Sequence, residues 1–264
     1  MMRILMIGDI VGRPGRYGVS QVLPALKAEY SIDLVVANGE NAAAGFGITR
    51  ATANELLAAG VDVITSGAHI WDQREIIEHM NDESLPLLRP LNYPPGVPGR
   101  GSIRISDTVG VVNLMGRVFV GNFDDPFQSV DYYLQSSETG MPLVILVDFH
   151  AEATSEKAAM GWYLDGQVSA LVGTHTHVAT CDHRILPKGT AYVSDLGMVG
   201  PMDSIIGSNP TDVLARFLTQ MPGRLKVANG DMIRFNSVMI DIDENSGRAE
   251  AIERLDRIIE YHER

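Results

Sequence analysis

The 264-residue sequence predicts an α/β fold in which two packed β-sheets are flanked by helices. Short, continuous apolar runs recur along the chain and end in polar clusters, which is typical of central strands buried on both faces. Segments with helical periodicity separate the first of these runs, so strands and helices alternate in a layered α/β arrangement. Later segments alternate polar and apolar residues, as antiparallel strands do.

The predicted elements follow in order. The apolar runs occupy residues 3–9, 33–41, 60–69, 142–152, 169–177 and 190–197. Residues 18–30 have apolar side chains at helical spacing, and a second helix begins with a Thr49 cap and stops at Gly60. Residues 85–101 are too rich in proline for regular structure, so we expect a long surface loop, a candidate border for a site. Residues 101–120 and 231–256 are expected to form antiparallel strands.

Composition and charge limit the classes of function. With 45% hydrophobic and 20% charged residues, the chain is typical of a globular protein, and we expect one domain over residues 1–264. Its 21 basic and 33 acidic residues give a net charge of -12, which disfavours a long nucleic acid or an anionic membrane as partner. The same charge repels a small phosphate unless arginines or bound cations reverse the field locally, which points to metal.

Cysteine usage and hydropathy indicate the compartment. Cys181 is the single cysteine, so an intrachain disulfide and a thiolate zinc cluster are both excluded, and a reducing compartment is expected. The apolar N-terminal segment is too short for a signal peptide, and no segment approaches the ~20 residues of a membrane span. We therefore expect a cytoplasmic protein without a membrane partner.

Polar clusters follow the apolar runs, at the strand ends where ligands collect in open α/β sheets. Four of the seven histidines lie there. A single strand-end histidine is more often structural than a ligand, but several such ends together favour a site. His175 and His177, two residues apart in an extended segment, are expected to address one ligand cluster together. The candidates are Asp9, Glu40, Asn41, His69, His150, Glu152, His175 and His177.

This set of carboxylates, an amide and imidazoles suits Mn, Fe, Zn, Co or Ni better than Mg alone or Ca. The donors suffice for two ions. A carboxylate can bridge two ions about 3.5–4 Å apart, and such a pair can activate a water and clamp a phosphoryl oxygen. Glu40 is the natural bridge, because Gly39 before it permits close backbone approach; a carboxylate at a helix start is the alternative.

Five motifs carry a resemblance to a known family: "GDIVGRPGR", "NGENAAAGFGIT", "VDFHAEATSEK", "GTHTHVAT" and "ILPKGTAYVSDLGMVGP". In order and spacing they resemble the YmdB-like family of calcineurin-type metallophosphoesterases, over most of the chain. The resemblance implies a four-layer αββα sandwich, a dinuclear metal centre, and phosphodiesterase activity on cyclic nucleotides, including the 2′,3′ forms. We also expect a homo-oligomer, a dimer or tetramer, and Fe or Mn ahead of Zn, Co or Ni.

Carried over by motif, the resemblance assigns Asp9, Glu40, Asn41 and His177 to one ion and Glu40, His150 and His175 to the other. His69 corresponds to the histidine of the family's Gly-Asn-His motif, which stabilises the phosphate or protonates the leaving group. Two departures belong to this subfamily: Val11 stands where the general superfamily has a histidine, with Asn41 compensating, and the bridging aspartate is a glutamate.

Ala68 is the departure with a chemical consequence, because "SGAH" stands where the family has Gly-Asn-His. The asparagine would ligate the second ion through its side-chain oxygen, and alanine has no donor. We therefore expect the second ion to bind more weakly, or with extra water, and turnover to be reduced. Two origins stay open: a natural outlier, or an engineered variant made to disable catalysis.

Each of the weaker candidates has a structural explanation as well as a functional one. The glycines of "GDIVGRPGR" lack the spacing of a nucleotide phosphate loop. Arg13 and Arg16 are candidates for substrate phosphate, or solvated surface residues, and Phe46 for stacking on a nucleobase, or core packing. Cys181 is expected to be a small buried filler rather than a nucleophile. Asp182 and His183 are expected either to orient ligating imidazoles or to lie on the surface.

The sequence leaves three functions in competition. The first is a dinuclear-metal phosphodiesterase that cleaves small phosphodiesters by attack of a metal-bound hydroxide, with His69 assisting departure, impaired in this chain by Ala68. The second is a non-enzymatic regulatory protein that keeps the metal fold and binds a nucleotide or a protein partner. The third is a phosphomonoesterase or nuclease, although the acidic charge argues against long polyanions.

Overall fold

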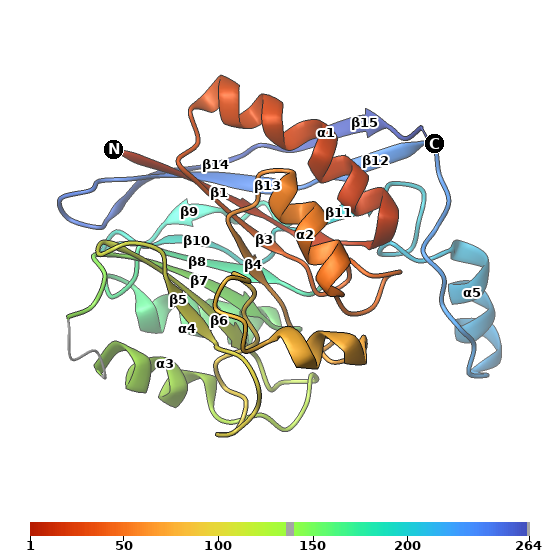
Figure 1. Cartoon of the computed structure of the whole chain (residues 1–264), viewed down its shortest axis with the longest axis horizontal. Helices are drawn as coiled ribbons and strands as arrows, with labels where there is room; N and C mark the ends of the chain where they lie inside the picture. Colours follow the sequence, from red (N-terminus) through yellow and green to blue (C-terminus); the bar gives the residue numbers. More distant parts are fainter. Residues whose placement is uncertain (136–139, 263–264) are drawn as a thin grey trace.

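Two β-sheets stack face to face in the computed structural model, which describes residues 1–135 and 140–262 (Figure 1). One apolar cluster lies between the sheets, and a second and a third lie between each sheet and the helices on its outer face. The expected four-layer αββα sandwich is confirmed. The outer layers are α1 (Gly12–Tyr30) and α2 (Arg50–Ala58) on one side and α3 (Pro126–Gln135) and α4 (Thr154–Leu164) on the other.

The first sheet has the order β14-β13-β1-β3-β4. Its strands are β1 (Met2–Ile7), β3 (Leu34–Asn38), β4 (Val63–Thr65), β13 (Ser237–Ile242) and β14 (Ala249–Arg254). β1, β3 and β4 are parallel, and the C-terminal strands add antiparallel, as expected. Ile4 packs toward the second sheet while Leu5 packs toward the helices, so both faces are buried and the runs are continuously apolar.

The second sheet has the order β5-β6-β7-β8-β10-β9. Its strands are β5 (Ser102–Arg104), β6 (Val109–Met115), β7 (Val144–His150), β8 (Ala170–Thr174), β9 (Arg184–Ile185) and β10 (Ala191–Val193). The antiparallel expectation for residues 101–120 is only half right. β6 is antiparallel to β5 but parallel to β7, and it is buried along its whole length because it lies inside the sheet.

A third, smaller sheet was not predicted. It consists of β15 (Arg257–Glu260), β12 (Met232–Phe235), β11 (Met198–Pro201) and β2 (Asp9–Ile10). The chain passes from β1 into β2 through Gly8, where a Cβ atom would lie 2.1 Å from the carbonyl oxygen of Gly197. Only glycine permits this approach, which brings Asp9 next to β11.

The remaining segments frame these layers. Residues 85–101 hold no helix or strand, as expected, but this loop is not confined to the surface, because Leu87 and Leu88 are buried and its backbone pairs with Ile64 of β4. A 3-10 helix, η1, spans Arg74–His79, and α5 (Pro210–Thr219) stands away from the sandwich (Figure 1). Within residues 1–135 and 140–262, none of the helices is long and apolar enough to cross a membrane.

Candidate metal centre

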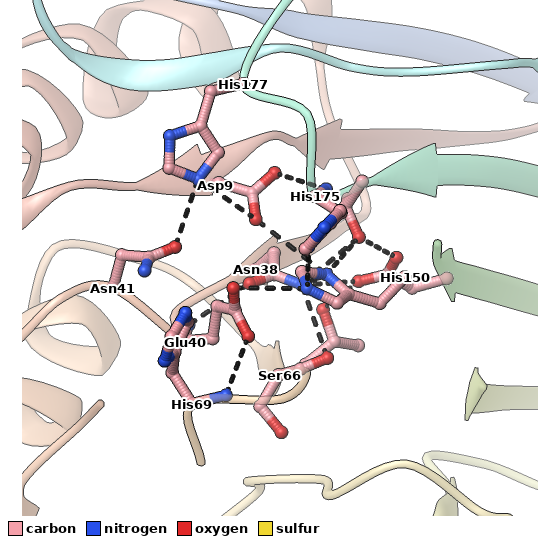
Figure 2. A network of polar contacts seen from close by, with 12 residues as sticks. Asp9, Asn38, Glu40, Asn41, Ser66, His69, His150, His175 and His177 are labelled. Carbon is pink, nitrogen blue, oxygen red and sulfur yellow. Dashed lines mark hydrogen bonds and ion pairs between the residues drawn. The ribbon is translucent and has the colours of Figure 1, made fainter. Parts of the chain in front are cut away.

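Asp9 at the start of β2, His150 at the end of β7 and the loops that follow β3, β4 and β8 bring the predicted polar side chains together (Figure 2). Nε2 of His150 lies 3.1 Å from Oε1 of Glu40 and 3.0 Å from Nδ1 of His175. Donor atoms of these three residues all lie within 4.8 Å of one another. This cluster has the composition of a site for one divalent cation.

A second cluster lies beside the first and contains Asp9, Asn41 and His177 (Figure 2). Nδ1 of His177 donates to the Ile206 carbonyl at 2.8 Å, so in the neutral ring the Nε2 lone pair faces Oδ1 of Asn41 at 3.2 Å. The Asn41 amide nitrogen donates to Gly45 at 3.0 Å, which turns its oxygen toward the ring. Two acceptors that face each other fit a cation between them.

The Asp9 carboxylate tests whether these residues fit a metal. Asp9 is fully buried, and its Oδ2 accepts from the backbone N–H of His175 at 3.1 Å. Its Oδ1 has no hydrogen-bond partner among the described residues and lies 3.8 Å from Nε2 of His177. A buried carboxylate oxygen without a donor is costly, and a bound cation removes that cost. The residues present therefore fit a divalent metal centre; the division of ligands between two ions stays a prediction.

The pKa values of the cluster follow from burial and mutual charge. Burial raises the pKa of Asp9 above its usual value, although His177 and His150 oppose the shift. Burial alone would lower the pKa of His150, but the nearby Glu40 and Asp9 carboxylates raise it to about 9. Burial and the charge of His150 lower the pKa of His175 to about 4. In the metal-free protein, the proton on His150 thus neutralises the Glu40 carboxylate. A bound metal ion would take over that role.

A buried polar network beneath the cluster fixes the tautomer of His150. The Thr174 hydroxyl donates to Oδ1 of Asp148 at 2.7 Å, so its oxygen accepts from Nδ1 of His150 at 2.9 Å. Nε2 is therefore the atom that His150 offers toward Glu40. Thr65 and Asn38 also donate to Asp148. Sequence reasoning missed these residues, although a carboxylate inside an apolar strand run was a usable signal.

The turn at residues 175–177 corrects one step of the sequence argument. β8 ends at Thr174, and the φ angles of His175 and His177 are +104° and +63°, so these residues are not extended. Both imidazoles reach the cluster through a left-handed turn, which non-glycine residues adopt only when their surroundings hold them. Asp195 supplies part of that hold, because Oδ2 accepts from the Thr176 backbone N–H at 3.1 Å.

Asp195 is itself neutralised inside the protein. Its Oδ2 lies 2.6 Å from Nζ of Lys157, and both side chains are buried. Oδ1 accepts from the backbone N–H of Gly197 at 2.8 Å. A buried ion pair thus fastens the turn that carries the two histidines, a role that the sequence analysis did not assign to either residue.

His69 lies at the open side of the cluster, after β4. Its backbone N–H donates to Oε2 of Glu40 at 3.2 Å, and its Nδ1 donates to Oδ2 of Asp72 at 2.8 Å. The Asp72 carboxylate, not assigned from the sequence, therefore leaves Nε2 of His69 available for a ligand. A Cβ at Gly67 would lie 2.3 Å from Nε2 of His150, so the backbone before half-buried Ala68 passes directly against the cluster.

A cleft of about 290 Å³ opens over the cluster. The polar part of its lining includes Glu40, Asn41, His69, Glu152, His175 and His177, and the apolar part includes Val11, Phe46, Ile206, Leu225 and Val227. Oε2 of Glu152 lies 3.0 Å from Nε2 of His175. The volume is near the lower end of the range for small-molecule sites. Residues 85–101 do not contribute to this lining.

The structure places only some of the weaker candidates at the cleft. Phe46 is half-buried and lines the cleft, whereas Arg13 is exposed and lines neighbouring hollows of the surface. Arg16 donates to Glu55 and to the Ala42 carbonyl, so its guanidinium is engaged within the fold. Cys181 is exposed, which corrects the expected buried filler.

Asp182 and His183 do not contact the imidazoles predicted to bind metal, so the role of orienting them is not confirmed. Asp182 accepts from the hydroxyls of Ser194 and Thr180. His183 is half-buried, and its Nδ1 has no hydrogen-bond partner within the described part of the chain. Neither residue is part of the cleft lining.

One protein-family model covers nearly the whole chain. The model of the family described as "YmdB-like protein" matches residues 5–255. The chain belongs to the YmdB-like family. It is 47% identical over 258 residues to the 2′,3′-cyclic-nucleotide 2′-phosphodiesterase of Bacillus subtilis, covering 96% of each chain. The expected family is therefore confirmed, and so, from this relative and those below, is the expected class of enzyme, a phosphoric diester hydrolase.

Solved structures of relatives have the same fold. A hypothetical protein from Thermus thermophilus superimposes with a TM-score of 0.90 at 44% identity, covering 98% of this chain and 99% of the other. A phosphatase from Mycoplasma pneumoniae superimposes with a TM-score of 0.91 at 32% identity, covering 98% and 94%. The YmdB-like chain thus shares its fold with these proteins over 98% of its length.

Metal binding should release a proton, with a defined dependence on pH. His150 holds its proton up to about pH 9 in the metal-free protein, and a ligating imidazole has to lose it. Between pH 6.5 and 8.5, the apparent affinity for Mn²⁺ should rise by up to about tenfold per pH unit. Calorimetric titrations in buffers of different ionisation enthalpy measure the release, expected to be about one proton at pH 7.5.

His262, which is exposed, provides the control, because His262→Gln should leave this release unchanged. An affinity for Mn²⁺ that does not change with pH, with no proton released, would show that His150 is not a ligand.

The buried ion pair predicts a large loss of stability. Lys157→Met leaves the Asp195 carboxylate buried without its counter-charge and should lower the free energy of unfolding by about 3–5 kcal/mol. The matched control is Arg117→Met, which removes an exposed pair with Asp125 and should cost less than about 1 kcal/mol. Urea denaturation of the metal-free proteins measures both. Equal losses in the two variants would refute the structural role of Lys157.

Proposed function

We propose that this chain is a metal-dependent phosphodiesterase that hydrolyses small phosphodiesters such as 2′,3′-cyclic nucleotides. The observation that carries the proposal is the buried Asp9 oxygen without a donor, next to convergent acceptors beneath a 290 Å³ cleft. The activity of the Bacillus subtilis relative supports the substrate class. The cleft volume of about 290 Å³ is near that of small-molecule sites, and the net charge of -12 disfavours a long polyanion.

The proposed metal centre uses the two clusters already described. Asp9, Glu40, Asn41 and His177 would hold one ion, and Glu40, His150 and His175 the other. Two bound divalent cations, Fe or Mn ahead of Zn, Co or Ni, would supply an activated water and positive charge for the phosphoryl oxygens. Hydrogen bonds orient two of the ligand imidazoles before metal binds. The Thr174 hydroxyl accepts from His150, and the Ile206 carbonyl accepts from His177.

His69 is the proposed proton donor to the departing oxygen. Asp72 accepts from Nδ1, so a proton that the ring gives to the departing oxygen comes from Nε2. The ring edge of Phe46 packs at 5.1 Å between centroids, which restricts the orientation of His69. Because His69 lines the cleft, it can reach a ligand while its backbone N–H remains bonded to Glu40.

Ala68 is the feature that lowers the proposed activity. Alanine offers no oxygen at a position adjacent to His69 and next to the backbone that contacts His150 and Glu40. We infer that the second ion is bound with one protein ligand fewer, which weakens its affinity and reduces turnover. The same observation favours the alternative function, a regulatory protein that binds metal and nucleotide without hydrolysing it.

The proposal includes the location, the oligomeric state and the partners of the protein. The exposed, free thiol of Cys181 supports a reducing, cytoplasmic location. Apolar side chains on and after α5 support the predicted homo-oligomer, because Phe217 is 78% exposed and Leu218 is 82% exposed. Long nucleic acids and membranes remain unfavourable partners because of the net charge of -12.

Restoring the missing donor tests the function. The unmodified chain and Ala68→Asn are loaded with Mn²⁺ and assayed on 2′,3′-cyclic AMP, a bis-aryl phosphodiester and an aryl phosphomonoester. Diester cleavage should rise about 10–100-fold in Ala68→Asn, since lost support for a metal typically costs that much. Ala44→Asn is the matched control, because Ala44 is exposed and has a φ of +54°, which asparagine tolerates.

Each pattern of results assigns a function. Cleavage of the diesters only, abolished by a chelator, supports the phosphodiesterase. Preference for the monoester would contradict it. Metal binding without hydrolysis by any of the three proteins would overturn the enzyme assignment in favour of the regulatory alternative.

A further inference from the structure

The apolar side of the cleft takes no part in the proposed metal binding or proton transfer. Ile206, Leu225 and Val227 line it together with Phe46, facing a space whose other lining is polar. Ile206 is 51% exposed, although it is a large aliphatic residue at the entrance to a site. An aliphatic side chain left in water beside a polar cluster is available to a ligand that carries an apolar part.

The backbone of Ile206 adopts a conformation that its side chain disfavours. Its φ angle is +47°, and a β-branched residue in the left-handed region is a genuine outlier. The surrounding loop holds it there: the backbone groups of Ile205 and Ser208 pair at 2.9 and 3.0 Å, and the Gly207 N–H donates to Ser204 Oγ at 2.9 Å. Such outliers cluster where function requires the geometry.

This conformation serves two purposes at once. The Ile206 carbonyl accepts from Nδ1 of His177 at 2.8 Å, which orients a predicted metal ligand. The side chain of the same residue lines the cleft. Glycine or asparagine would meet the backbone requirement at lower cost, so the requirement for a carbonyl does not account for isoleucine. The presence of an aliphatic side chain at this position therefore requires a separate explanation.

The remaining apolar residues form one continuous surface with Ile206. A Cβ at Gly45, whose φ is +93°, would lie 2.8 Å from Val227, so the turn carrying Phe46 packs closely against the segment 225–227. The N–H of Ala228 donates to the Gly207 carbonyl at 2.9 Å, which joins that segment to the Ile206 loop. Phe46 in turn contacts His69. The apolar surface therefore reaches from the proposed proton donor to the ring of His177.

We propose that Ile206, with Leu225 and Phe46, forms the subsite for the nucleobase of the phosphodiester, and that Ile206 is a specificity-determining residue. The inference rests on the proposed function. With the phosphate at the polar cluster, the group attached to it lies along the apolar side, and a nucleobase presents flat apolar faces suited to such packing. A diester with a small polar substituent would leave these side chains in water.

The test compares two substrates that differ only in the base: 2′,3′-cyclic AMP and the 2′,3′-cyclic phosphate of methyl riboside. Both are assayed with the Mn²⁺-loaded chain and with Ile206→Ala and Ile206→Gly, which keep the carbonyl that binds His177. The kcat/KM ratio in favour of the nucleotide should fall about tenfold or more in both variants. Ile258→Ala is the matched control, because Ile258 is 55% exposed and does not line the cleft.

A ratio that stays constant while both rates fall would show that Ile206 acts only through His177 and would overturn the subsite. If the unmodified chain cleaves neither substrate, the proposed function fails, and binding then tests the subsite by itself. Calorimetry with adenosine 3′-monophosphate and the 3-phosphate of methyl riboside, which differ only in the base, should give tighter nucleotide binding, with the difference lost in Ile206→Gly. Equal affinities of the two ligands for the unmodified chain would refute the proposal.

Discussion

Two carboxylates are buried where the two sheets meet, and their negative charge has to be neutralised. Asp9 and Glu40 are fully or almost fully inaccessible, and one Asp9 oxygen has no donor among the described residues. A proton on His150 offsets part of the charge, which is why its pKa is raised to about 9. Burial raises the pKa of Asp9, and the opposing effect of His177 and His150 does not cancel that rise. The site is thus arranged for cations, because a buried charge is tolerated only when it is paired.

The rest of the architecture holds the donors around these carboxylates. Thr174 and Asp148 fix the ring of His150 from below, and the pair Lys157 and Asp195 fastens the turn between the other two histidines. The unfavourable backbone of Ile206 belongs to the same arrangement, since its carbonyl orients His177. Buried polar contacts compensate for the backbone strain at the site. Such compensation is typical of sites whose side chains are held in position before the ligand binds.

The sequence predicted the layers and the positions of the central strands because their pattern is local. Runs such as residues 142–152 are continuously apolar on account of burial on both faces, and the polar residue that ends each run lies at the same sheet edge. Long-range geometry was out of reach. Nothing local indicates that β6 pairs in parallel with β7, or that Gly8 redirects the chain into a third sheet through contact with Gly197.

At the site, too, local sequence patterns were predictive and long-range geometry was not. Residue types and spacing identified the set of donors, but the extended geometry assumed for His175 and His177 was wrong, because a left-handed turn brings them in. Asp72 and Thr174 were missed, since a carboxylate or hydroxyl that supports a histidine is recognised only by its distance from the ring. Arg16 was a candidate by charge alone, and the structure engages it with Glu55 instead.

Locating the metal ions tests the central claim most directly. Crystals of the Mn²⁺-loaded protein, measured at wavelengths on either side of the Mn absorption edge, should give anomalous peaks at the two clusters. One peak should contact Asp9 and His177, the other His150 and His175, with Glu40 between them. The peak at His150 and His175 should be the weaker one because of Ala68. A Mn²⁺ ion bound only elsewhere on the protein, with the Asp9 oxygen still unpaired, would contradict the account.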